Sequence, residues 1–157
     1  MQERTPAGEA ATEVILSIFR ANGLLLASGD VLSAGEGLTS ARWQVMGAID
    51  LADRPLTVPQ IARRMGITRQ SVHATVNRLV TDGLVELAAN ADHRRSQLVR
   101  LTKLGQRRYA VLDRRQAEWV DRLVHGIGPA ELDTTARVLA ELSARLEAET
   151  EPARSAT

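Results

Sequence analysis

The spacing of apolar residues predicts two helices in the first third of the chain. Over residues 10–33 apolar side chains recur three or four positions apart, which is typical of one long amphipathic helix. Gly23 lies inside this stretch and favours a bend, because glycine has a low helix propensity. After the break at "SAGEGLTS", Thr39 or Ser40 is a suitable N-cap for a second helix that ends near Ala52.

The next positions predict two short helices joined by a glycine turn. Thr57 and Gln60 have the spacing of a capping box, which predicts that a helix begins there. Gly66 suits the left-handed geometry that ends a helix, and Thr68 is placed to cap a following helix over residues 69–81. Two short helices connected in this way form a helix-turn-helix unit.

The predicted 69–81 helix has two chemically different faces when it is wound at about 100° per residue. Its valine and leucine side chains gather on one side, whereas Gln70, Ala74 and Asn77 gather on the other. Amide side chains pair with adenine in the major groove, and a small alanine leaves room for a thymine methyl group. The outer face therefore predicts base recognition, because an ordinary solvated helix would carry several Lys and Glu there.

Two short apolar runs, LVELA and SQLVRL, follow this helix and flank a basic turn. They predict a β-hairpin, and a hairpin directly after a helix-turn-helix is a wing. Thr102 then caps a long amphipathic helix, and Pro129 begins a last helix that ends near Ala148. Residues 149–157 are predicted to be a disordered tail. The predicted fold class is mainly α with a small β-hairpin wing, in a single domain over residues 1–157.

Composition excludes several functional classes. The 157 residues include no cysteine, which removes disulfides and thiolate metal sites and suits a reducing, cytoplasmic location. The N-terminus does not resemble a secretory signal, and no apolar run approaches about 20 residues, so no membrane contact is expected.

His73, His93 and His125 do not form a metal-ligand pattern, and no phosphate loop or nucleophile elbow is present. Neither an enzyme nor a cofactor is therefore expected.

The net charge of +1 hides an uneven distribution. Residues 54–108 carry eleven Lys/Arg and three Asp/Glu, and the rest of the chain carries nine against sixteen. The middle of the chain therefore has a charge of +8 and the flanks have −7. This segregation is typical of a surface that faces an anionic partner, although charge alone fits a solvated basic face equally well.

The run "LTVPQIARRMGITRQSVHATVNRLVTDGLVELAANADHRRSQLVRLTKLG" resembles the winged helix-turn-helix transcription regulators of the MarR (multiple antibiotic resistance regulator) family. With the flanking helices, the resemblance covers about residues 10–148. It implies an obligate homodimer in which residues 10–33 and 102–148 form the dimerisation helices. Residues 39–101 would form the DNA-binding lobe, which places its recognition helix in the major groove of a pseudo-palindromic, double-stranded DNA operator.

The chemistry of the residues and the resemblance together assign the DNA contacts. The expected base-reading set comprises Gln70, Ser71, Ala74 and Asn77. The expected phosphate contacts come from Arg69, Arg78 and Arg95. His73 flanks the recognition face and is expected to contact DNA or water. Asp92, Arg94 and Arg95 match the family's Asp-x-Arg wing pattern, which implies that Arg94 enters the minor groove while Asp92 orients one of the two arginines.

The resemblance also implies a small effector, because members of this family often bind aromatic or phenolic anions between the dimer helices and the DNA-binding lobe. The candidate pocket residues are Phe19, Arg20, Trp43 and Met46, although an isolated Trp and Phe at helical spacing more often belong to a core. The function expected is a sequence-specific repressor released by such a ligand, since a dimer on a promoter blocks polymerase by occupancy. The alternative is a winged-helix protein-interaction module that does not bind DNA.

Overall fold

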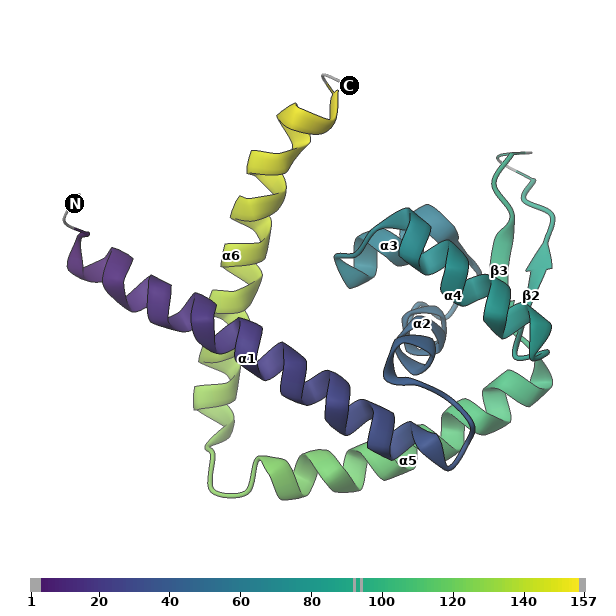
Figure 1. Cartoon of the computed structure of the whole chain (residues 1–157), viewed down its shortest axis with the longest axis horizontal. Helices are drawn as coiled ribbons and strands as arrows, with labels where there is room; N and C mark the ends of the chain where they lie inside the picture. The colour runs from purple at the N-terminus through teal and green to yellow at the C-terminus, as the bar shows by residue number, and fades with distance from the viewer. Residues whose placement is uncertain (1–3, 92, 94, 156–157) are drawn as a thin grey trace. The chain divides into compact units, whose positions relative to one another are not determined.

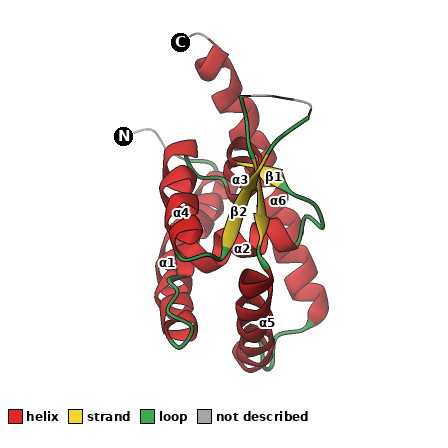
Figure 2. Cartoon of the chain, turned by 90° about the vertical axis from the view of Figure 1, so that its right-hand side faces the viewer, coloured by secondary structure: helices red, strands yellow, loops and turns green. Residues whose placement is uncertain are grey.

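A computed structural model describes residues 4–91, 93 and 95–155, and the chain divides after Ala117 into two units, each described by itself. The first unit contains α1 (Pro6–Ala34), α2 (Ser40–Asp50), β1 (Leu56–Thr57), α3 (Val58–Met65), α4 (Arg69–Thr81), β2 (Val85–Ala88), β3 (Leu98–Leu101) and most of α5 (Lys103–Leu123). The second unit contains the end of α5 and all of α6 (Pro129–Ser155). Figure 1 labels these elements along the chain except β1, which Figure 2 labels.

The sheet has three antiparallel strands in the order β1-β3-β2. Val85 of β2 pairs with Leu101 of β3, which confirms the predicted hairpin, and Figure 2 shows its two long arms leaving the sheet. Leu56 of β1 pairs with Val99 on the other edge of β3. β1 was not predicted from the sequence, because two residues are too few to show an alternating pattern. The mainly helical fold with a winged hairpin is confirmed.

The hydrophobic core of the first unit lies where α2, α4 and the sheet pack together. Side chains with no exposed surface come from each of these elements and from α3, and include Met46, Ile61, Val72, Leu79, Leu84 and Val99. Burial of one such side chain contributes about 1.5–3 kcal/mol to folding. The hydrophobic contribution to folding is therefore concentrated on the buried side of α4, opposite its polar face.

The predicted helix ends are confirmed around the helix-turn-helix. The backbone N–H of Thr57 donates a 2.8 Å hydrogen bond to Oε1 of Gln60, as expected for a capping box. Gly66 has a φ of +64°, which ends α3 in the left-handed region. Thr68 Oγ1 accepts a 3.1 Å hydrogen bond from the N–H of Ser71 and caps α4.

Thr102 joins the base of the wing to the start of α5. Its hydroxyl donates a 2.7 Å hydrogen bond to the Gly83 carbonyl and accepts a 3.0 Å bond from the N–H of Gly105. Its own N–H donates a 3.0 Å bond to the Leu84 carbonyl. Gly105 packs so closely against that carbonyl that a Cβ atom would collide with it. The "LT..G" spacing of the sequence therefore fixes where β2 begins relative to α5.

Three predicted boundaries are corrected. α1 begins at Pro6 rather than near residue 10 and continues through Gly23 as one helix. α2 ends at Asp50, before the predicted end near Ala52. α6 continues to Ser155, so the prediction of a disordered tail is wrong for residues 149–155. Glu149, Glu151, Ala153 and Arg154 favour helix in this stretch, and Pro152 lies within the helix without ending it.

α1 also corrects the expectation that no segment resembles a membrane span. Within the described part of the chain, it is the one helix long and apolar enough to cross a membrane by length and composition alone. A single helix of this kind is weak evidence for membrane insertion. A helix that packs against another helix in a soluble protein passes the same test of length and composition.

We expect Gly105→Ala to destabilise the first unit by about 1–3 kcal/mol, because the added Cβ meets the Leu84 carbonyl and the backbone must move. The matched control is Gly23→Ala in α1, where a Cβ meets nothing within 4 Å. This control should stabilise by about 0.5–1 kcal/mol through helix propensity. Denaturant unfolding at one fixed protein concentration measures both, and equal stability of the two variants would contradict the close packing.

Candidate nucleic-acid interface

The two faces of α4 are separated in the structure as the sequence predicts. Val72, Val76 and Leu79 are buried in the core of the first unit. Every residue of α4 that was predicted to contact DNA is exposed, namely Arg69, Gln70, Ser71, His73, Ala74, Asn77 and Arg78. The burial of one face thus presents the amide and arginine side chains of the other face to solvent.

A groove of about 450 Å³ lies beside this exposed face. Five residues of α4 line it: Arg69, Gln70, His73, Val76 and Asn77. The start of α3 contributes Val58 and Pro59, and the returning arm of the hairpin contributes Arg95, Ser96 and Gln97. The structure therefore brings the recognition helix and the described part of the wing to one concave surface. Ser71, Ala74 and Arg78 are exposed on the same helix but do not line the groove.

Asn77 and His73 interact with each other within the groove. The Nδ2 atom of Asn77 lies 3.2 Å from Nδ1 of His73, one helical turn away. When Nδ1 carries no proton, the asparagine amide donates this hydrogen bond. The contact orients the amide and leaves Oδ1 and a second N–H for the edge of a base. His73 therefore acts on the predicted reading residue Asn77, a pairing that the i,i+4 spacing of the sequence could have indicated.

The wing is described in part. Arg95 is exposed and lines the groove, whereas the predicted Asp92 and Arg94 lie outside the described residues, so their roles stay predictions. Sequence reasoning missed Gln97, which lines the groove beside Arg95. The signal was present, because an amide side chain directly before the apolar run of β3 matches the chemistry of the α4 face.

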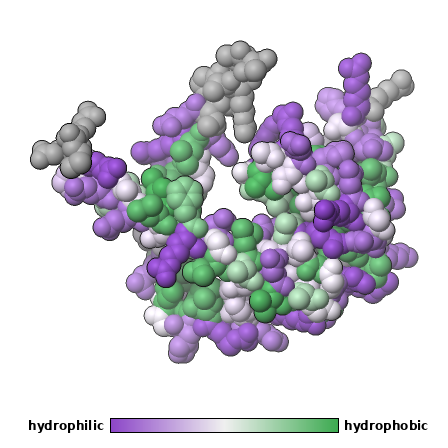
Figure 3. Space-filling view, viewed as in Figure 1, coloured by the Kyte–Doolittle hydropathy of each residue, from purple (hydrophilic) through white to green (hydrophobic). Residues whose placement is uncertain are grey.

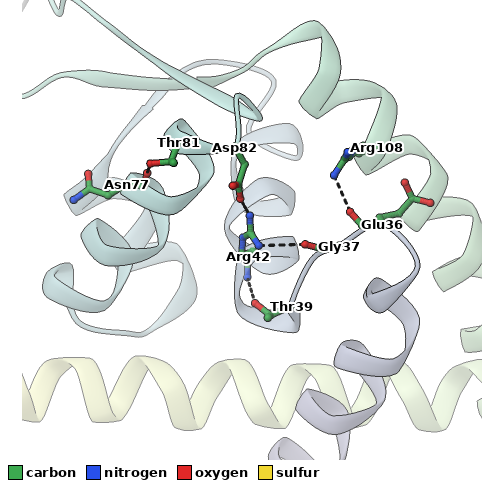
Figure 4. Close-up of polar contacts among 8 residues, drawn as sticks. All are labelled: Glu36, Gly37, Thr39, Arg42, Asn77, Thr81, Asp82 and Arg108. Atoms are coloured by element: carbon green, nitrogen blue, oxygen red, sulfur yellow. Dashed lines mark hydrogen bonds and ion pairs between the residues drawn. The ribbon is translucent and has the colours of Figure 1, made fainter.

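An ion pair lies at the C-terminal end of α4. Figure 4 shows Arg42 of α2 beside Asp82, the C-cap residue of α4, with which it forms an ion pair. Burial lowers the pKa of the Arg42 guanidinium, and the positive charges of Arg78 and Arg108 lower it further. An arginine still carries its charge at neutral pH. The positive charges of Arg42, Arg78 and Arg108 therefore lie near one another at the end of α4, where Arg42 also pairs with Asp82.

The four predicted pocket residues differ in their exposure within the single chain. Trp43 and Met46 belong to the hydrophobic core, with 8% and 0% of their surface exposed. Phe19 is 70% exposed on α1, and the neighbouring Arg20 is exposed as well. Within one protomer, the described structure thus offers Phe19 and Arg20 to a ligand, whereas Trp43 and Met46 serve packing.

Comparison with known proteins assigns the lobe to a family. A sequence profile of the MarR family matches residues 36–96, which include α2, the helix-turn-helix and β2 and end before β3. An uncharacterized protein of Mycobacterium tuberculosis is 43% identical over 136 residues, covering 87% of this chain and 94% of that protein. The transcriptional activatory protein BadR of Rhodopseudomonas palustris is 30% identical over 109 residues, covering 66% of this chain and 61% of BadR.

Solved structures of MarR-family regulators share the fold. The Mycobacterium tuberculosis transcriptional regulator MOSR, solved in complex with DNA, has a TM-score of 0.72 and 22% identity, covering 85% of this chain and 96% of MOSR. Staphylococcus aureus MarR, solved in complex with salicylate and kanamycin, has a TM-score of 0.74 and 17% identity, covering 90% of this chain and 95% of that one.

We expect Asn77→Ala to relax base preference at one position of each half-site by about 1–3 kcal/mol, because a bidentate amide contact to adenine is lost. Selection of bound duplexes from a random pool measures the change. The matched control is Asn22→Ala, the same substitution at an exposed position of α1, which should leave the selected sequence unchanged. An identical selected sequence for Asn77→Ala and the unaltered protein would contradict base reading by this residue.

Proposed function

Because this chain belongs to the MarR family of winged-helix transcription regulators, we propose that it is a dimeric, sequence-specific DNA-binding regulator. Each protomer inserts α4 into a major groove and its arginine wing into the adjacent minor groove. The two protomers read the halves of a pseudo-palindromic operator about one helical turn apart. The fold and the family are those of regulators rather than enzymes.

The observation that carries this proposal is the exposed, acid-free face of α4. Gln70 and Asn77 lie on that face, and together with Arg69 and Arg95 they line one groove. Amides read base edges while arginines neutralise phosphates, so the groove combines specificity with affinity. The DNA complex of the related M. tuberculosis regulator supports the same use of this fold. A protein-interaction module, the alternative, has no need of this combination.

Dimerisation is supported by apolar surface that the single chain leaves uncovered. Eight large apolar side chains of α1 besides Phe19 are exposed, among them Leu16, Leu24 and Val31 at 62%, 60% and 79%, and Figure 3 shows apolar surface along α1. α6 exposes four more: Leu132, Val138, Leu139 and Leu146. Amphipathic helices need a partner to cover such stripes. A second copy of the chain supplies complementary stripes on the same helices.

The proposed regulator is a repressor that a small aromatic or phenolic ligand releases from DNA. A dimer bound across a promoter blocks polymerase by occupancy, which favours repression, whereas BadR is named an activator. The salicylate complex of S. aureus MarR supports the ligand class. In this chain, Phe19 and Arg20 provide an exposed ring and a cation that suit an aromatic anion.

We expect the affinity for the selected duplex to fall by about three to five decades between 50 and 200 mM salt, as for about six to ten phosphate contacts per dimer. Fluorescence anisotropy measures this slope. Arg95→Ala should reduce the slope of affinity against salt, and Arg94→Ala should weaken the affinity for DNA. The control variant Arg137→Ala on α6 should change neither the slope nor the affinity. Added salicylate should weaken binding of the unaltered protein. Failure to bind any duplex at low salt would favour the protein-interaction alternative.

We expect light scattering to give the mass of a dimer at micromolar concentration. Leu16→Glu and Val31→Glu together should shift the protein toward monomer, because charges then interrupt the apolar stripe of α1. The control is Ala21→Glu, a charge added at a smaller exposed side chain of α1, which should disturb the dimer less. A folded, stable monomer of the unaltered protein would rule out the proposed assembly.

A further inference from the structure

Arg42 of α2 lies between the C-terminal end of α4 and the loop that joins α1 to α2. Its side chain, 17% exposed, extends from the first turn of α2. The guanidinium pairs with the carboxylate of Asp82, and its Nη1 donates a 3.2 Å hydrogen bond to the carbonyl of Gly37. Figure 4 shows these two contacts diverging from one side chain toward the end of α4 and toward the loop after α1. One arginine thus connects the recognition helix to the α1–α2 loop.

The partner of Arg42 sits where a negative charge is unfavourable. Asp82 is the C-cap of α4, and the C-terminal end of a helix carries partial negative charge. Arg42 offsets this repulsion, but its own burial has a cost, and its Nε atom is buried without a hydrogen-bond partner in the described structure. A gain in folding free energy alone does not account for this ion pair, because well-packed apolar residues often stabilise a protein as much as a buried ion pair does.

The other side of the same loop is held by α5. Nη1 of Arg108 donates a 2.8 Å hydrogen bond to the Glu36 carbonyl. The Glu36 carboxylate lies 3.3 Å from Nη2 of Arg115. The loop is therefore fixed between α5 on one side and the Arg42–Asp82 pair on the other. α1, whose last turn leads into this loop, is held by these contacts together with a direct 2.6 Å hydrogen bond from the N–H of Ser40 in α2 to Oδ1 of Asp30.

We propose that Arg42 is a positioning residue that fixes the recognition helix relative to α1 and thereby sets the half-site spacing that the dimer accepts. The inference rests on the proposed function, since α1 is part of the proposed dimer interface. In such a dimer, the distance between the two α4 helices follows from the angle between α1 and α4 within each protomer. The packing of α1 on α2 and of α2 on α4 sets this angle coarsely, and Arg42 fixes it through Asp82 and Gly37 without itself touching the bases.

The test uses duplexes that carry two copies of the selected half-site, with centre-to-centre spacings stepped by single base pairs around one helical turn. The unaltered protein is expected to show one preferred spacing. For Arg42→Gln, the affinity ratio between the preferred spacing and its one-base-pair neighbours should shrink about three- to tenfold. Asp82→Asn, at a side chain that is 42% exposed, should give the same broadening. The charge-matched control Arg137→Gln should retain the sharp preference.

A purely structural role predicts a different result. Loss of folded protein weakens binding to all duplexes by one factor and leaves the spacing ratios unchanged. The double variant Arg42→Gln/Asp82→Asn should broaden the preference no further than either single change, because both remove the same contact. Unchanged spacing ratios in the folded Asp82→Asn variant would overturn the inference. If the unaltered protein binds no duplex, the proposed function fails instead, so the two failures are distinguishable.

Discussion

The structure of the DNA-binding lobe depends on the burial of one face of α4. A helix of thirteen residues is marginal in water by itself, so α4 gains its stability from packing rather than from its own hydrogen bonds. Val72, Val76 and Leu79 supply that packing against α2 and β2. Because apolar side chains hold the helix in place, none of the polar residues on its outer face is required for folding, and those residues remain available to a ligand.

Hydrophobic burial sets the face of α4 but not its angle, and directional polar contacts supply this second constraint. Thr102 ties the turn after α4 to the start of α5, and Arg42 ties the same end of α4 to the α1–α2 loop. Each such hydrogen bond contributes only about 0.5–1.5 kcal/mol, but each has a preferred distance and direction. The lobe thus combines a strong, non-directional core with weak bonds that fix orientation.

Features encoded by neighbouring residues could be predicted from the sequence. The capping box of Thr57 and Gln60, the left-handed Gly66 and both faces of α4 depend on residues at most a few positions apart, and all three are confirmed. The exposed position of Arg95 in the groove followed from the wing pattern. Residues 149–155 were assigned wrongly because helix propensity continued beyond the last clear apolar repeat.

Features that depend on residues far apart in the sequence could not be predicted from the sequence. β1 exists only because Leu56 meets Val99, and no local alternation marks it. The Arg42–Asp82 pair joins positions forty residues apart, and it becomes visible only once α2 and α4 are packed. Trp43 has the same helical spacing as a pocket residue would have, and only the three-dimensional structure shows that it packs in the core.

Gly105 has a consequence for how such a regulator diverges. Since no side chain fits at this position against the Leu84 carbonyl, the root of the hairpin is fixed, whereas its exposed tip and the outer face of α4 are free to change. Mutations that alter the preferred operator can therefore accumulate during evolution without a new backbone arrangement. After gene duplication, two copies can acquire different target promoters while both keep one inherited scaffold.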